Sequence, residues 1–190
     1  MATVKVFADT NTLYPYYVCD LLLHCAEEDL FTVLWTEDLL AELIDVLPRN
    51  KKKSRASVEG MCDAIRRAFP EAEVLRQDYE NLIGQMPGKD PDDHLHSAAA
   101  VAAKADVLLT YNTRDFPPRS LARHGLRVTN VDQFMCEQFA AFPDDLVRVL
   151  HNQVEDTTKS KLDLVALLTV LDHPGGAPRF VRLVRRHLNR

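Results

Sequence analysis

The chain has 190 residues, of which 46% are hydrophobic and 27% charged, with 10 Pro and 6 Gly; this length suits one domain plus an appendage, and the composition excludes a disordered or fibrous protein. The formal net charge of −5 argues against nucleic-acid binding through the overall field of the chain. Yet 10 of the 23 Lys and Arg residues lie in two short segments, residues 49–55 and 179–190, which serve either as solvated surface or as contacts for RNA or a protein partner.

The sequence shows no pattern for export or membrane insertion. The amino terminus lacks the basic start and apolar core of a secretory signal, and no stretch approaches roughly 18 uninterrupted apolar residues. We therefore expect a cytoplasmic protein with no membrane contact. The four cysteines have no C-x-x-C spacing, which argues against a disulfide framework or a zinc knuckle and predicts reduced, mostly buried thiols.

The chain begins with a predicted strand, turn and helix. Residues 4–8 form a β-prone apolar run that stops at Asp9, the first residue of the polar turn D-T-N-T. Residues 13–28 then carry apolar side chains at spacings suited to a largely buried helix.

A second strand and helix follow. Residues 31–35 form a compact apolar strand, and Thr36 can cap the next helix. The apolar face of that helix runs over residues 39–47, with Glu42 near its start.

The next segment is polar before it becomes amphipathic. The basic stretch 49–57 predicts a loop or helix start, and an amphipathic helix is expected over residues 57–69, ended by Pro70. Residues 73–76 are predicted to form a short strand.

Further helix and strand signals lie in the second half. Asp90, followed by a proline and two acids, is the pattern of a helix cap. The Ala-rich run 97–105 is the expected helix, and residues 107–110 and 126–128 are the next strands. Strands that alternate with helices predict a three-layer α/β/α fold with a central parallel sheet, because parallel neighbours need crossover helices.

The pattern changes past about residue 138, where helices follow without strands. We expect residues 1–137 to form the α/β domain and residues 138–190 a helical C-terminal extension. Its helices are predicted at residues 144–154, 161–171 and 179–188.

Several polar side chains are expected to converge at one edge of the sheet. In an open parallel sheet, ligands bind beyond the carboxyl ends of the strands. The side chains placed there, or on the helices next to that edge, are Asp9, Glu42, Asp93, Thr110, Asn112 and Asp115. Four carboxylates in one place repel one another unless cations neutralise them. Oxygen ligands favour Mg²⁺ or Mn²⁺, which also screen a phosphodiester and activate a water.

Three motifs of this sequence resemble the PIN-domain family. They are VKVFADTN at the amino terminus, then WTEDLLAEL, then DPDDHLHSAAAVAAKADVLLTYNTRDF. The resemblance implies a PIN-like nuclease domain over residues 1–137 and a divalent-metal-dependent endoribonuclease activity. It also looks like the VapC-type ribonuclease toxins of type II toxin-antitoxin pairs, which implies an RNA substrate and a small antitoxin protein as partner. A homodimer is left open.

The resemblance also implies a set of site residues. The catalytic acids would be Asp9, Glu42, Asp93 and Asp115, and the metal ligands Asp9, Asp93 and Asp115. The groups that order water or ligands beside the metal would be Thr10, Asn11, Thr110 and Asn112. Asp90 and Asp92 are rivals to Asp93, which is preferred because the family places its acid immediately before the Ala-rich helix. Weaker candidates for RNA or partner contacts are Lys51, Lys52, Lys53, Arg55 and Arg114.

Three other readings of the same residues remain. His94 and His96 form H-x-H, a weak zinc signal without a third soft ligand. An aspartyl-phosphate mechanism on Asp9, as in haloacid-dehalogenase-like phosphatases, needs a second Asp where this chain has Asn11. A PIN fold that has lost catalysis and only binds RNA or protein is the alternative function; the presence of all four acids argues against it.

Overall fold

The computed structural model describes residues 3–50, 54–156 and 162–189, and its centre is a four-stranded parallel sheet. The strand order is β2-β1-β3-β4, and every neighbouring pair runs in parallel. The strands are β1 (Lys5–Ala8), β2 (Thr32–Leu34), β3 (Val107–Leu109) and β4 (Arg127–Thr129). The predicted parallel sheet is confirmed, with each strand within two residues of its expected bounds.

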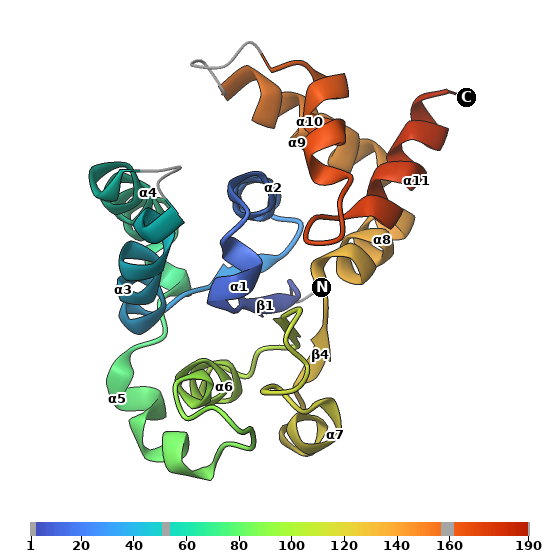
Figure 1. Cartoon of the computed structure of the whole chain (residues 1–190). Helices are drawn as coiled ribbons and strands as arrows, with labels where there is room; N and C mark the ends of the chain where they lie inside the picture. Colours follow the sequence, from blue (N-terminus) through green and yellow to red (C-terminus); the bar gives the residue numbers. More distant parts are fainter. Residues whose placement is uncertain (1–2, 51–53, 157–161, 190) are drawn as a thin grey trace.

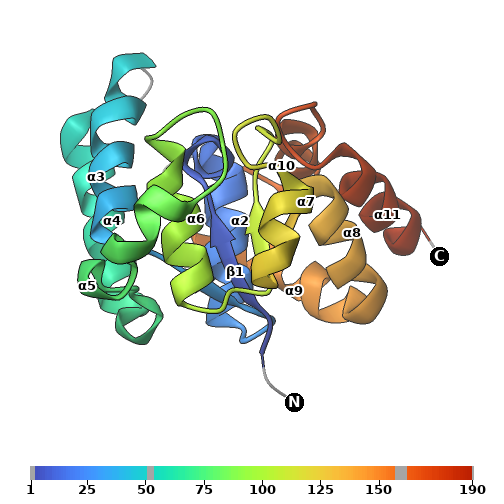
Figure 2. The same cartoon turned by 90° about the horizontal axis from the view of Figure 1, so that it is seen from below.

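Helices cover both faces of the sheet, which confirms the three-layer prediction (Figures 1 and 2). The α-helices are α1 (Thr10–Leu13), α2 (Tyr16–Glu27), α3 (Glu37–Val46), α4 (Arg55–Ala68), α5 (Arg76–Tyr79), α6 (Asp93–Ala102), α7 (Pro118–Leu121), α8 (Val131–Ala141), α9 (Pro143–Asp156), α10 (Leu164–Leu171) and α11 (Pro178–Leu188). Short 3₁₀ segments are η1 (Leu47–Asn50), η2 (Pro70–Ala72), η3 (Glu80–Gln85) and η4 (Ala122–His124).

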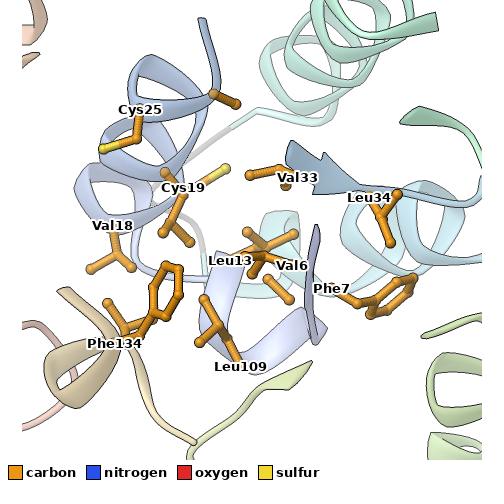
Figure 3. Packing of buried hydrophobic residues seen from close by; sticks show 14 of the residues in the cluster. Val6, Phe7, Leu13, Val18, Cys19, Cys25, Val33, Leu34, Leu109 and Phe134 are labelled. Atoms are coloured by element: carbon orange, nitrogen blue, oxygen red, sulfur yellow. The ribbon is translucent and has the colours of Figure 1, made fainter. Parts of the chain in front are cut away.

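The central strands β1, past Lys5, and β3 are buried because their apolar side chains alternate between the two helix layers, whereas the edge strand β4 is only partly buried. Figure 3 shows Val6 and Val33 pointing toward α2, while Phe7 points to the opposite side. On that opposite side the ring of Phe7 lies 5.9 Å from the ring of His96 on α6. This near-continuous apolar composition is typical of parallel strands covered on both sides.

Local side-chain chemistry fixes where the first helices start. Thr36 caps α3 as predicted, since its hydroxyl accepts a hydrogen bond from the Leu39 backbone N–H at 3.0 Å. Ser54 caps α4 and starts that helix at Arg55, slightly before the expected residue 57. The helix predicted over residues 13–28 is found as α2, which starts only at Tyr16, because Pro15 has no backbone N–H to donate within a longer helix. The predicted turn after Asp9 forms the short helix α1 instead.

Two predictions between residues 70 and 95 are wrong. Residues 73–76 do not form a strand: Glu73 makes one isolated bridge to Trp35, and α5 begins at Arg76. Asp90 does not cap α6 either. Its carboxylate accepts from the Asp92 backbone N–H at 3.1 Å within the preceding turn, and the helix starts at residue 93 without a side-chain cap.

The C-terminal helices pack onto the α/β part. The predicted helices 144–154, 161–171 and 179–188 are found as α9, α10 and α11; α10 starts at Leu164, and residue 161 lies outside the described residues. Helix α9 packs on α2, and α11 packs on α8, where the rings of Phe139 and Phe180 meet at 5.8 Å. A domain boundary at residue 137 stays a prediction; in the structure that residue lies within α8.

Two expectations from composition can be compared with the structure. Within the described residues, no helix is both long enough and apolar enough to span a bilayer. All four cysteines are free, with Cys19, Cys25 and Cys62 buried and Cys136 half-buried, which confirms the predicted thiols.

Candidate active site

Asp9 is the most firmly held acid at the carboxyl edge of the sheet. It follows β1 directly, caps α1, and is only 1% exposed. One carboxylate oxygen accepts from the Thr12 backbone N–H at 2.8 Å, and the other accepts from the Thr110 hydroxyl at 2.5 Å. The Thr12 hydroxyl donates to the carbonyl of Leu109 at 3.0 Å. Asp9 is therefore fixed by its own turn and by the end of β3.

The environment of Asp9 disfavours an isolated negative charge. Burial raises its pKa, and the hydrogen bonds from Thr110 and Thr12 and the nearby His96 ring offset only part of that rise. A cation placed beside this buried carboxylate would therefore lower its energy.

Asp93 lies at the start of α6 and shares this electrostatic environment. Burial raises its pKa to about 6; His96 opposes the rise, and Asp9, Asp90 and Asp115 add to it. Asp93 is therefore close enough to Asp9 and Asp115, the two other expected metal ligands, for their charges to act on it. The rivals Asp90 and Asp92 are exposed, whereas Asp93 is half-buried.

Asp115 is positioned by the loop that follows β3. The Asn112 side-chain amide donates to its carboxylate at 2.7 Å, and the Asn112 backbone N–H donates to the Thr110 hydroxyl at 2.8 Å. Since Thr110 donates to Asp9, a continuous hydrogen-bonded path joins the two carboxylates. Thr110 and Asn112 thus hold the carboxylates of Asp9 and Asp115 in place.

Glu42 is held by a histidine at the border of this group. A Glu42 carboxylate oxygen lies 2.7 Å from Nε2 of His96, and the Thr10 hydroxyl lies 3.5 Å from the same nitrogen. Burial raises the pKa of Glu42, but the hydrogen bond and charge of His96 outweigh it, so the pKa is lowered overall. The Glu42 side chain is 45% exposed and the His96 side chain only 3% exposed, so Glu42 can reach solvent while its partner His96 is buried.

His96 and Thr12 are the two residues of this region that sequence reasoning did not assign to it. His96 influences the pKa values of Asp9, Glu42 and Asp93 alike. A signal for it existed, because residues three apart on a helix share a face, as Asp93 and His96 do. The zinc hypothesis gains no support from these contacts, because Nε2 of His96 lies against Glu42 and Nε2 of His94 lies 3.4 Å from the carbonyl of Gly88.

The remaining predicted residues make no contact with the aspartates that the described part of the structure shows. Asn11 is exposed, and no hydrogen bond given by the described residues draws it toward Asp9. Arg55 is exposed and pairs with Glu59 at 2.9 Å. Arg114 is exposed in the loop after β3. The other basic candidates, Lys51, Lys52 and Lys53, lie outside the described residues.

The donor chemistry fits a hard cation, although the side chains do not form a closed ligand set. Asp9, Asp93 and Asp115 offer only oxygen ligands, and burial and mutual repulsion raise the pKa of Asp93. Within the part of the chain that the structure describes, their oxygens are not gathered at metal-binding geometry. These aspartates therefore suit a hard divalent cation by their negative charge and their oxygen ligands.

A glycine brings a second loop against this edge. Gly88 has a φ of +144°, a backbone conformation that favours glycine, and a Cβ at this position would lie 2.4 Å from the carbonyl oxygen of Asp115. The loop before α6 and the loop after β3 are therefore in direct backbone contact.

The fold and this edge define an α/β protein with a group of acidic side chains near the carboxyl ends of its strands, the usual place for a ligand in such sheets. The PIN domain family profile matches residues 5–114, more than half of the chain, and the chain belongs to that family. The match includes Asp9, Glu42 and Asp93 and stops one residue before Asp115.

A curated relative extends this comparison. The Mycobacterium tuberculosis protein named "Putative ribonuclease VapC50" is 27% identical over 108 residues, which cover 57% of this chain and 62% of the relative. The similarity thus spans less than two thirds of the relative's length. The comparison with solved structures gives no match.

Proposed function

We propose that the protein is a Mg²⁺- or Mn²⁺-dependent endoribonuclease that hydrolyses RNA phosphodiester bonds. One observation carries the proposal: Thr110 and Asn112 join the carboxylates of Asp9 and Asp115 by hydrogen bonds at the carboxyl edge of the sheet, and Asp93 lies close enough for both charges to act on it. Such a group of acids is stabilised by cations, and a hard divalent cation accepts oxygen ligands.

The three aspartates would hold the metal, and neighbouring residues would orient them. A bound Mg²⁺ or Mn²⁺ would neutralise phosphate charge and acidify a water for attack on phosphorus. Thr110 holds the carboxylate of Asp9, and Asn112 holds that of Asp115.

Glu42 is the proposed catalytic carboxylate outside the metal set. It lies partly exposed beside His96, which lowers its pKa against the effect of burial. Glu42 is therefore ionised near neutral pH and able to accept a proton from a water or from the substrate.

Membership of the PIN family and the name of the mycobacterial relative support a ribonuclease and, more specifically, the toxin of a toxin-antitoxin pair. We propose RNA as substrate, a small antitoxin as inhibitory partner, and the cytoplasm as the place of action. A catalytically silent binding module is the alternative that the experiment below separates.

The test is cleavage of RNA by purified protein freed from any partner. We expect cleavage with Mn²⁺ or Mg²⁺, loss of cleavage with EDTA, and loss of at least about 100-fold in the Asp9→Asn and Asp93→Asn variants. Asp106→Asn is the matched control: Asp106 precedes β3 at the opposite edge, where its carboxylate accepts from the Lys5 backbone N–H at 2.8 Å. Folded wild-type protein that cleaves no RNA with either metal would overturn the enzymatic proposal.

The toxin proposal has its own test in cells. Expression of the wild-type chain should arrest growth, the Asp9→Asn variant should not, and co-expression of a small DNA-binding protein encoded next to it should restore growth. Equal arrest by wild type and Asp9→Asn would contradict toxicity through cleavage.

A further inference from the structure

Helix α11 presents a row of arginines on one side. Arg179, Arg182 and Arg186 are all exposed and, at spacings of three and four residues, share one face of the helix. Together with Cys136 and Leu183 they line a shallow hollow of about 200 Å³ between α8 and α11. We call Arg179, Arg182 and Arg186 the arginine row.

The helix beneath the row is firmly anchored. Phe180, Val181 and Val184 are fully buried on its other side. A carboxylate oxygen of Asp132, on α8, accepts from the backbone N–H groups of Arg179 at 2.7 Å and Phe180 at 3.0 Å, which caps the start of α11. The row is thus displayed on a fixed support.

Most of the charge in the row is not neutralised by the protein. The Arg179 guanidinium donates to the neutral Gln133 side chain at 2.7 Å. Arg182 and Arg186 make no ion pair with any residue that the structure describes, whereas Arg185, turned to another side of the same helix, pairs with Asp172 at 2.6 Å. Arg190, at the end of the basic segment, lies outside the described residues.

The row begins next to the candidate active site. The hydroxyl of Tyr111, in the loop that carries Asn112 and Asp115, donates to the carbonyl of Gly176, and α11 starts two residues later at Pro178. Figure 2 shows the β3–α7 loop and the α10–α11 loop at the same end of the molecule. The row therefore extends from the rim of the site along α11.

We infer that the arginine row binds the phosphate backbone of single-stranded RNA and guides it toward the carboxylates; this inference rests on the proposed function. Guanidinium groups match phosphate oxygens in a planar, two-point geometry. From Arg179 to Arg186 the helix rises roughly 10 Å, which is enough for about two or three successive phosphates. Because the whole chain carries a net charge of −5, RNA needs a local cationic surface of this kind to approach an acidic site.

The test measures binding of a short fluorescein-labelled single-stranded polyuridine by anisotropy, in EDTA so that no metal-dependent cleavage occurs. The Arg182→Gln/Arg186→Gln double variant is compared with Arg148→Gln/Arg185→Gln, which removes two arginines that are ion-paired in the structure. Each double variant changes the net charge from −5 to −7, so both carry the same overall charge.

The expected effect follows from counterion release. Each lost phosphate contact lowers the slope of log affinity against log salt by about 0.7 on single strands, so the Arg182/Arg186 variant should lower it by about 1.4 and weaken binding about 25-fold at roughly 0.1 M salt. The control variant should lose much less. Equal losses in the two variants, or none in either, would overturn the inference.

Two further measurements separate this inference from other outcomes. If wild-type protein binds RNA through the row but cleaves none with Mn²⁺, the inference stands and the proposed function fails. If cleavage depends on Asp9 while the Arg182/Arg186 variant binds RNA like its control, the proposed function stands and the inference fails. Binding of poly-glutamate that depends on the row and exceeds binding of RNA would assign this surface to an acidic protein, against the inference.

Discussion

The cap that Asp132 places on α11 gives a prediction whose size can be worked out from the structure. Asp132 is 9% exposed, and one of its oxygens accepts from both the Arg179 and Phe180 backbone N–H groups. Asp132→Ala removes this acceptor and leaves the N–H of the buried Phe180 without a partner. Loss of hydrogen bonding to a charged group costs about 1.5–3 kcal/mol, so we expect a destabilisation of about that size.

The Asp132→Asn variant separates the hydrogen bonds from the charge. Asparagine keeps an oxygen in the same place, so both bonds can remain, and only the attraction between the carboxylate and the helix dipole is lost, about 0.3–1 kcal/mol. Urea denaturation followed by circular dichroism gives the free energy of unfolding of each variant. Asn130→Ala serves as a reference, because Asn130 caps α8 by accepting from the Gln133 backbone N–H at 2.9 Å.

The reasoning about this cap is refuted by either of two results. One is a loss of less than about 0.5 kcal/mol in Asp132→Ala, which is within the effect of an ordinary surface substitution. The other is an equal loss in Asp132→Ala and Asp132→Asn, which would show that the shared acceptor oxygen contributes nothing.

Three further predictions concern the carboxylates and their loops. Mn²⁺ at about 100 times its Kd should raise the Tm of the wild type by roughly 5–11 °C in a thermal scan. The Asp9→Asn variant should lose this shift, and the Asp106→Asn control should keep it. A metal ligand must be deprotonated, so with the pKa of Asp93 raised to about 6, Mn²⁺ affinity measured by calorimetry should fall as the pH drops through about 6; constant affinity from pH 7 to 5 would contradict that shift. Gly88→Ala places a Cβ 2.4 Å from the Asp115 carbonyl oxygen and should lower RNA cleavage roughly tenfold or more. Gly84→Ala is the control, because nothing lies within 4 Å of its Cβ, and it should leave cleavage unchanged. Equal cleavage rates in the two variants would contradict the contact at Gly88.

Apolar patterning was sufficient to predict the sheet. Its strands are short apolar runs bounded by polar turns, and the helices between them require parallel neighbours. Apolar patterning was not sufficient for the strand predicted over residues 73–76 or for the helix cap predicted at Asp90. Val74 is buried, but Leu75 is 45% exposed, and only Glu73 bridges to Trp35, so residues 73–76 lack the partners of a strand. At Asp90 a local turn competes with the helix cap and uses the same carboxylate.

The sequence located the candidate acids better than it described their surroundings. Asp9 and Asp115 follow strands, a position that a pattern can identify. The contact between Glu42 and His96 joins helices far apart in the chain, and nothing in the spacing of the two residues predicts it. The hydrogen bond from Thr110 to Asp9 depends on the register of β1 beside β3, which becomes known only once the strands are paired.

The register of the central strand also sets when the site can form. Strand β1 pairs with β3, so Asp9 and its partner Thr110 are separated by 101 positions in the chain. Bringing two residues so far apart in the chain together costs conformational entropy before the hydrogen bonds between the strands compensate for it. Non-local parallel pairing therefore forms slowly. In a nascent chain, Asp9 therefore lacks its Thr110 partner until the strand that ends at Leu109 has been synthesised and has docked.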